Sequence, residues 1–344
     1  MNVTDQKDLE DVEYCFLSGN LSCPKEKRAS AVYAILYTFF IGGILMTVCG
    51  NLVVIISIIH FKNLHTPTNL FVMSLAVADF LLGAIVMPFS MVRSIETCWY
   101  FGDSFCVFHS NVDLILSTVS VFHLMFIAVD RYYAVSDPLL YVTKITMPLA
   151  WFFIVTSWTV AVIYVCIIYY FKGNTEGMEG YDPCPGDCII VFNSTWGTLD
   201  TIVTFFLPCS LMLFLYTKIF IIAKKHQKVI STIEDQFQPR EDTTQKATKH
   251  KDKKATKTLT IVIGIFILCW LPYFVNSLMD PFLSYRTPPI IVDALQWLGY
   301  FNSGFNPIIY GLFYPWFQRA LKLIVTFRVF STDSSLLCLF PENN

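Results

Sequence analysis

The sequence predicts an all-α membrane protein: a seven-transmembrane helix bundle followed by a short amphipathic eighth helix. Of its 344 residues, 55% are hydrophobic and only 15% are charged. This is too much apolar surface for one water-soluble domain of this length. Seven stretches are also long enough to cross a hydrocarbon core of about 30 Å, which requires about 20 predominantly apolar residues. A lipid bilayer must therefore cover much of the molecule.

The seven spans are expected at approximately residues 31–59, 69–92, 105–129, 147–171, 189–216, 258–280 and 288–313. Proline falls inside several of them, and it is tolerated in membrane bundles because neighbouring helices and water satisfy the freed carbonyls. Helices are therefore favoured over a barrel. We expect three parts: an extracellular N-terminal segment 1–30, the bundle 31–313 with its basic intracellular loop 224–257, and an amphipathic helix with a cytoplasmic tail, 314–344.

Orientation follows from the basic residues in the loops, because cytoplasmic loops carry an excess of Lys and Arg. One side of the predicted bundle collects Lys62, Arg131, Lys144, the Lys residues of 218–257, Arg319, Lys322 and Arg328. The N-terminus is therefore expected outside the cell. Glycosylation sequons begin at Asn2, Asn20 and Asn193, all on the opposite side, as glycosylation requires. No cleavable signal precedes the first span, so we expect that span to direct insertion itself.

The outer segments carry an even set of cysteines. Six of the eleven lie there: Cys15, Cys23, Cys98, Cys106, Cys184 and Cys188. In an oxidising compartment such a set indicates three disulfides. The spacing alone leaves the pairing open, because six cysteines can pair in many ways.

Asp79, Asp113 and Asp200 are acidic residues inside the predicted spans, where ionisable groups are costly and usually functional. We expect no Lys or Arg at the same depth, so the interior should be negative and should require a cation or protonation. Asp113 lies two helical turns inside Cys106, and Asp200 shortly precedes Pro208. Both carboxylates are therefore expected in the outer halves of their spans, with Asp79 deeper.

An ordered set of short motifs resembles the rhodopsin-like G protein-coupled receptors over the whole transmembrane region. The set comprises Gly50-Asn51, Leu75-Ala76-Val77-Ala78-Asp79, Asp130-Arg131-Tyr132, Trp158, Pro208, Cys269-Trp270-Leu271-Pro272 and Asn306-Pro307-Ile308-Ile309-Tyr310. The segment 302–317, together with Cys98-Trp99-Tyr100-Phe101-Gly102, is similar to the trace amine-associated receptors, most of them olfactory. The resemblance to fish-type members with two acidic pocket residues is close.

For the outer site, the resemblance implies a small cationic amine whose ammonium pairs with Asp113. Catechol-binding relatives carry a hydroxyl residue where this chain has Asp200, so the carboxylate suggests a second ammonium and a diamine or polyamine ligand. The alternative is an Asp200 turned toward solvent or a loop. Aromatic faces stabilise a desolvated ammonium by cation–π contact, and the expected ones are Trp270, Tyr273, Phe274, Trp297 and Tyr300.

Deeper in the bundle, the resemblance implies a sodium site with hard oxygen ligands from Asp79, Ser120, Asn302, Ser303 and Asn306. A purely structural, water-filled network is the alternative. Apart from this allosteric ion, no cofactor is expected.

At the inner end, Asp130-Arg131-Tyr132 and Tyr310 are expected to serve G protein coupling. Arg131 should pair with Asp130 in the inactive receptor, and an outward swing of span six near Pro272 should open a cavity for a Gα helix. The resemblance implies a stimulatory or olfactory G protein, rising cyclic AMP, and a place in the plasma membrane, in olfactory cilia among other sites.

Other functions are less well supported. We find no metal-ligand cluster, phosphate loop or nucleophile–base pair, so no enzyme is expected, and no nucleic acid partner is indicated. A cation channel or amine transporter would usually show internal repeats and broken helices in both halves, which are not evident. A receptor for another biogenic monoamine remains the closest alternative.

The resemblance also implies disulfide pairs. Rhodopsin-like receptors join span three to the second outer loop, which corresponds to Cys106 with Cys188. The trace amine receptor pattern implies Cys15 with Cys184, and Cys23 with Cys98.

Overall fold

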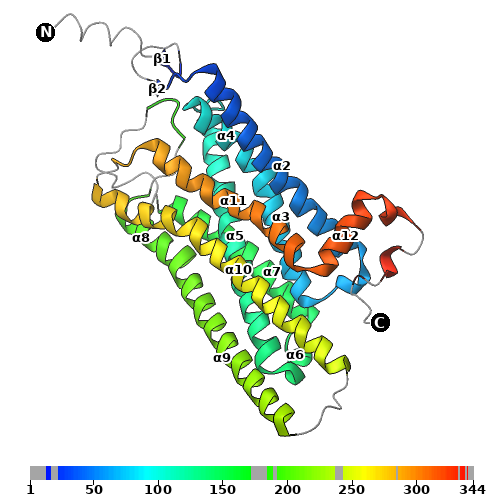
Figure 1. The fold of residues 1–344 in the computed structure, drawn as a ribbon. Helices are drawn as coiled ribbons and strands as arrows, with labels where there is room; N and C mark the ends of the chain where they lie inside the picture. Colours follow the sequence, from blue (N-terminus) through cyan, green and yellow to red (C-terminus); the bar gives the residue numbers. More distant parts are fainter. Residues whose placement is uncertain are drawn as a thin grey trace, which may run out of the picture.

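The computed structural model describes residues 13–16, 22–171, 184–188, 192–236, 243–283, 286–331, 334–337 and 339. Within this part of the chain, long helices pack side by side as a bundle, with the N-terminal hairpin at one end and α12 at the other (Figure 1). The predicted glycosylation sites Asn2 and Asn20 lie outside the described residues.

The seven spans follow the predicted order. They are α2 (Ser30–His60); α3 (Pro67–Leu81), η2 (Leu82–Val86) and α4 (Met87–Glu96); α5 (Asp103–Ser136); α7 (Met147–Tyr170); α8 (Ser194–Asp200), η3 (Thr201–Phe206) and α9 (Leu207–Gln236); α10 (Thr243–Met279); and α11 (Pro289–Phe313). The shorter elements are β1 (Glu13–Tyr14), β2 (Pro24–Lys25), η1 (Lys62–Leu64), α6 (Pro138–Lys144), η4 (Asp280–Leu283), α12 (Pro315–Val325), η5 (Arg328–Phe330) and η6 (Ser334–Leu336).

Six spans in the described part of the chain are long and apolar enough on composition alone to cross a membrane. The seventh, α11, has 25 residues and is therefore about 37 Å long. Its lower hydropathy comes from polar residues that it turns inward, among them Asn302 and Asn306, which are 5% and 2% exposed. The predicted seven-helix fold is confirmed, and the helices of spans three, five and six continue beyond their predicted inner ends.

Apolar side chains cover the outside of the bundle and several polar side chains are buried inside it, which is the reverse of a soluble protein. Ile35 and Leu268 are 67% and 71% exposed on the outside of the bundle, whereas Asn51 is fully buried. An exterior of this kind is stable only in contact with lipid acyl chains. The predicted eighth helix, α12, is amphipathic: it buries Trp316 and Phe317 and leaves Lys322 exposed.

Two wide π turns interrupt spans that were predicted as regular helices. Residues Leu82–Val86 follow Asp79 in the second span, and Thr201–Phe206 follow Asp200 in the fifth. A π turn inserts an extra residue into the helix, so it rotates the side chains beyond it relative to those before it. In this bundle the turns set which residues of the outer helical segments face the interior.

Three disulfides fasten the outer end. Cys106 bonds to Cys188, as predicted. The other two predicted pairs are wrong, because the structure joins Cys15 to Cys98 and Cys23 to Cys184.

These four cysteines form one cluster, so sequence spacing could not resolve their partners. The short β1–β2 ladder places Cys15 beside Cys23, with Cys15 N donating to Cys23 O at 2.9 Å. Cys23 N in turn donates to Pro185 O at 3.0 Å, which aligns Cys23 with Cys184 and leaves Cys15 next to Cys98. The ladder therefore selects the pairing.

This pairing predicts a specific pattern of double-variant stability. Cys15→Ala, Cys98→Ala and their double variant should lower the melting temperature equally, because all three remove one bond that is worth about 2–4 kcal/mol. Cys15→Ala combined with Cys184→Ala removes two bonds and should melt lower than either single variant. Thermal unfolding of detergent-solubilised receptor measures this. A Cys15→Ala/Cys98→Ala variant that melts well below both single variants would contradict the assignment.

Candidate functional site

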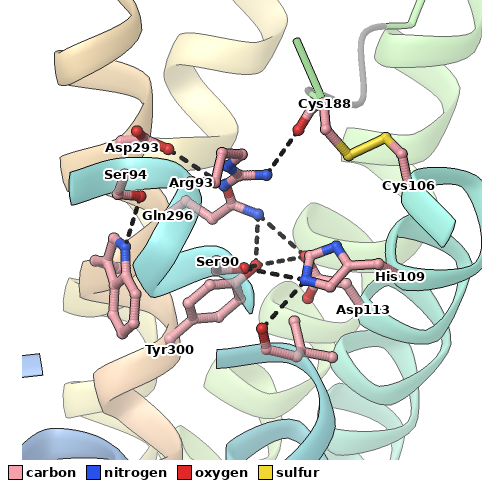
Figure 2. Close-up of polar contacts among 12 residues, drawn as sticks. Ser90, Arg93, Ser94, Cys106, His109, Asp113, Cys188, Asp293, Gln296 and Tyr300 are labelled. Carbon is pink, nitrogen blue, oxygen red and sulfur yellow. Dashed lines mark hydrogen bonds and ion pairs between the residues drawn. A yellow bond between two sulfur atoms is a disulfide. The ribbon is translucent and has the colours of Figure 1, made fainter. Parts of the chain in front are cut away.

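Asp113, on α5, is the centre of the outer polar cluster. It is 7% exposed. Its Oδ2 accepts hydrogen bonds from Tyr300 Oη at 2.6 Å and from Gln296 Nε2 at 3.0 Å, and its Oδ1 accepts from Ser117 Oγ at 3.4 Å. Figure 2 shows Asp113 of α5 beside Gln296 and Tyr300 of α11. The donors are all neutral, so they orient the carboxylate without cancelling its charge.

Gln296 and Arg93 are functional candidates that the sequence reasoning missed. Gln296 precedes Tyr300 by one helical turn and therefore shares its face of α11, a signal that was available. Arg93 is 8% exposed, at the outer end of α4, and the expectation of no basic residue at this depth is wrong. The predicted second span ended at residue 92, which assigned Arg93 to a solvated loop.

In the described part of the chain, a cavity lies beside Asp113. Its walls comprise Arg93, His109, Ser110, Asp113, Tyr273, Val292 and Gln296. Tyr273 is thus the predicted aromatic residue that lines this space with Asp113. His109 Nε2 lies 3.1 Å from Val86 O and 3.2 Å from Ser90 Oγ, so the ring is tied to the second span.

Trp270 and Phe274 form an aromatic group on α10 next to Tyr273. The ring centroids of Trp270 lie 5.9 Å from those of both Tyr273 and Phe274. Phe274 stacks on Phe205 of the fifth span at 4.5 Å. Gly299 allows the Trp270 ring to approach α11, because a Cβ at that position would lie 2.8 Å from the ring. These contacts couple the sixth span to the fifth and the seventh directly below the cavity.

Trp297 was predicted to face the ligand and does not line this cavity. Its ring lies 4.1 Å from that of Phe40 on α2, and its Nε1 donates to Ser94 Oγ at 3.0 Å. Trp297 is next to Gln296 in sequence, so it points about 100° away around the helix. It packs α11 against α2 and α4 instead.

Asp200, the last residue of α8, is also buried, at 6% exposure. Its Oδ1 accepts a hydrogen bond from Tyr164 Oη of α7 at 2.7 Å. The alternative that Asp200 points to solvent is therefore wrong. The Tyr273 phenol is close enough to both Asp113 and Asp200 to interact electrostatically with each of them.

Asp79 organises a second polar cluster deeper in the bundle. Its Oδ1 accepts from Ser303 Oγ at 2.7 Å and Ser120 Oγ at 3.2 Å, and its Oδ2 accepts from Asn306 Nδ2 at 2.8 Å. The Oδ1 of Asn306 is buried without a protein partner. Asn302, predicted for the same cluster, interacts with the Cys269 thiol of α10.

The inner end holds a third cluster, around Asp130 and Arg131. Arg131 Nε donates to Asp130 Oδ2 at 2.8 Å, and Arg131 also donates to Thr68 Oγ1. Asp130 accepts from Thr68 Oγ1 at 2.7 Å and from Tyr141 Oη of α6 at 2.8 Å. Burial, followed by the nearby Asp130 charge, raises the pKa of Tyr141 to about 12, so the phenol keeps the proton that it donates.

Of the other two residues predicted here, Tyr310 is buried at the inner end of α11 with a hydroxyl that lacks a protein partner. Its ring packs against those of Tyr314 and Phe317. Tyr132 is partly buried and packs against the hydrophobic core. The ion pair that we predicted between Asp130 and Arg131 is present.

Comparison with known proteins identifies the family to which this bundle and its polar clusters belong. Residues 50–310 match the family described as 7 transmembrane receptor (rhodopsin family). Trace amine-associated receptor 4 of Mus musculus is 48% identical over 346 residues, covering 100% of each chain. Trace amine-associated receptor 13c of Danio rerio is 50% identical over 343 residues, 99% of each chain, and trace amine-associated receptor 1 of Homo sapiens is 44% identical over 333 residues, 96% of this chain and 98% of that one.

The fold and the three buried clusters define a rhodopsin-like, class A G protein-coupled receptor, which is a multi-pass plasma membrane protein and not an enzyme. Within that class, the chain belongs to the trace amine-associated receptors.

The inner cluster predicts the effect of removing one hydroxyl. Tyr141→Phe should raise ligand-free nucleotide exchange on G protein by about tenfold or more, because a hydrogen bond to a charged group is worth about 1.5–3 kcal/mol and this one restrains the Asp130–Arg131 pair. Thr143→Ala is the matched control: Thr143 is an exposed α6 residue whose hydroxyl bonds only to Leu140 O in the described structure. Unchanged basal exchange in Tyr141→Phe at equal surface expression would contradict this role.

Proposed function

We propose that this receptor binds a small cationic amine at Asp113 and transmits that binding to a heterotrimeric G protein. The observation that carries the proposal is a buried carboxylate in a cavity wall whose hydrogen-bond donors are all neutral. A buried unpaired charge is costly, and a ligand ammonium would compensate it. In the described chain, the buried Arg93 and the partly buried Arg131 form their ion pairs with Asp293 and Asp130 instead.

The aromatic residues beside Asp113 support an ammonium ligand. Tyr273 lines the cavity and Trp270 and Phe274 adjoin it. An ammonium over such a ring gains about 0.5–2 kcal/mol. This contribution is smaller than that of the carboxylate, so it should adjust affinity among amines rather than decide whether an amine binds.

For the ligand class, we propose a diamine or polyamine whose two ammonium groups are held by Asp113 and Asp200. Asp200 is a second buried carboxylate with a neutral partner, Tyr164, and Tyr273 interacts electrostatically with both acids. A flexible spacer of a few carbons would pass beside Tyr273. A one-amine ligand would leave one of the two carboxylates uncompensated.

The second candidate is a receptor for a single-ammonium biogenic amine. Its supporting observation is that Tyr164 already donates a short hydrogen bond to Asp200, and Asp200 is not among the residues that line the described cavity. In that reading Asp200 serves to hold the fourth span against the fifth.

For signalling, we propose that the amine binds the active arrangement more tightly, since only differential affinity shifts a two-state equilibrium. The active arrangement would release Arg131 from Asp130 and admit a Gα helix beside Arg131 and Tyr310.

We propose that the receptor activates a stimulatory or olfactory G protein and raises cyclic AMP. We also propose that it lies in the membrane of olfactory cilia with its N-terminus outside the cell. The disulfides at the N-terminal end of the bundle support that orientation, because disulfides persist in oxidising compartments.

We also propose that the Asp79 cluster holds an allosteric sodium ion. Asp79 supplies the negative charge, Ser120 and Ser303 supply hydroxyl oxygens, and the buried Oδ1 of Asn306 lacks a protein partner. Hard oxygen donors of this kind suit a hard cation. Asn302 would contribute from the edge of the cluster, beside Cys269.

The diamine proposal predicts ligand-selective losses. Asp113→Asn should silence all amines, whereas Asp200→Asn should weaken diaminoalkanes by at least about tenfold and spare the monoamines of equal length. Loss of one partner of a buried charge pair costs roughly 2–5 kcal/mol, and about 1.4 kcal/mol is tenfold in affinity. Cyclic AMP dose–response curves for both ligand types measure this.

Asp103→Asn is the control for outer negative charge in general, because Asp103 is an exposed residue at the start of α5. It should leave both ligand types unaffected. If Asp200→Asn shifts diamines and monoamines by the same factor, Asp200 is not an ammonium partner and the single-ammonium reading replaces the diamine one.

The sodium proposal predicts that agonist affinity depends on sodium and that Asp79→Asn removes this dependence. Sodium would bind the inactive arrangement of the receptor more tightly than the active one. Raising the sodium concentration from about 10 to 150 mM should therefore lower agonist affinity in the unmodified receptor. Agonist binding with choline replacing sodium keeps the ionic strength constant. An Asp79→Asn receptor with the same sodium response would leave Asp79 a purely structural role.

A further inference from the structure

Arg93 is a buried cation in the wall of the cavity that contains Asp113. It does not pair with Asp113. Its Nη2 lies 3.2 Å from Asp293 Oδ1 on α11, and its Nη1 donates to Cys188 O at 2.8 Å. Figure 2 shows the guanidinium held between α11 and the Cys106–Cys188 disulfide.

Gln296 lies between this guanidinium and Asp113. Its Oε1 accepts from Arg93 Nη2 at 2.8 Å, while its Nε2 donates to Asp113 Oδ2 at 3.0 Å and to Tyr300 Oη at 2.6 Å. A guanidinium can only donate and an ionised carboxylate can only accept, so the amide has one orientation that satisfies both. A neutral group therefore separates the cation from the acid.

Asp293, Gln296 and Tyr300 are spaced three and four residues apart and share one face of α11. Arg93 and Asp113 reach that same face from α4 and α5. Two carboxylates, Asp293 and Asp113, are thus available to one guanidinium. Asp293 is the more exposed of the charged pair, with a side chain 24% exposed against 9% for Arg93, yet it is the one that holds the cation.

We propose that Asp293 is a positioning residue for amine recognition: it holds Arg93 away from Asp113 and so keeps the Asp113 carboxylate available to a ligand ammonium. Without the Asp293 charge, Asp113 and Asp187 are the remaining acids that interact electrostatically with Arg93, and of these two Asp113 lines the described cavity. An Arg93–Asp113 pair would occupy the ammonium position and neutralise it. This inference rests on the proposed function, because it presupposes that Asp113 binds the amine.

The test uses the full-length receptor with diaminoalkanes and monoamines of equal chain length as probes. Asp293→Asn should lower the potency of both ligand types by at least about tenfold, because both need the Asp113 carboxylate. Arg93→Gln alone should lower potency by a smaller factor than Asp293→Asn does, because it leaves no cation that could pair with Asp113. The double variant Asp293→Asn/Arg93→Gln should recover potency to within about threefold of the unmodified receptor, because no cation is left to compete.

The rescue separates this role from a structural one. If the Arg93–Asp293 pair served only to hold α4 against α11, then Arg93→Gln would be as damaging as Asp293→Asn and the double variant would recover nothing. Either result overturns the inference, as does an Asp293→Asn receptor of unchanged potency. Surface expression, measured with an N-terminal epitope, identifies variants that fail to fold, and potency is compared only among receptors at the surface.

Two controls complete the design. Asp280→Asn removes another negative charge from the outer end, where Asp280 accepts a hydrogen bond from Thr287 at 2.6 Å and does not contact Arg93. It should leave potency unchanged. Asp113→Asn tests the proposed function itself: if that variant still responds to amines, the proposed function fails. If it is silent while Asp293→Asn is normal, only the present inference fails.

Discussion

The absence of water from the hydrocarbon region makes every buried charge in this bundle dependent on groups supplied by other helices. Asp79, Asp113 and Asp130 illustrate this at three depths. Each accepts hydrogen bonds from at least one other span: Asp79 from α11, Asp113 from α11, and Asp130 from α3. Because an unsatisfied charge is so costly, these contacts fix the relative rotation of the spans. The site residues are therefore part of what holds the helices in register.

Two continuous helices connect the three clusters. The single helix α5 carries Asp113, Ser120 and Asp130, and α11 carries Tyr300, Ser303 and Tyr310. A ligand that changes the hydrogen bonds of Asp113 thereby acts on a helix whose inner end bears the Asp130–Arg131 pair. The Trp270 ring, seated against Gly299, extends this connection to α10. Coupling of this kind requires two discrete arrangements of packed helices rather than a continuous deformation.

Hydropathy predicted the seven spans, because it reports span length, and short motifs predicted the acidic centres of the clusters, because each motif residue is confined to one depth. Of the residues that line the described outer cavity, only Asp113 and Tyr273 were predicted as ligand contacts. The failures have physical causes. Arg93 was missed because hydropathy cannot separate a snorkelling arginine at the membrane edge from one that is buried by α11. Trp297 was misplaced because one residue along a helix is a rotation of about 100°. The cysteine pairing depends on a two-residue ladder, β1–β2, that no sequence period reveals, and the π turns leave no sequence signal that we recognise.

The unexpected cation also bears on which ligands the site can hold. Arg93 and Asp293 form a pair that is neutral as a whole, so the uncompensated charge of the outer site remains that of Asp113 and Asp200. At short range, however, the two charges of the pair do not cancel. The guanidinium lies on the α4 side of the cavity, where it would repel the second ammonium of a bound diamine. Tyr273 is the residue that interacts with both acids. In the proposed diamine complex, a dication bound at Asp113 would therefore extend past Tyr273 toward Asp200. The Arg93 charge would favour that direction over the α4 side of the cavity.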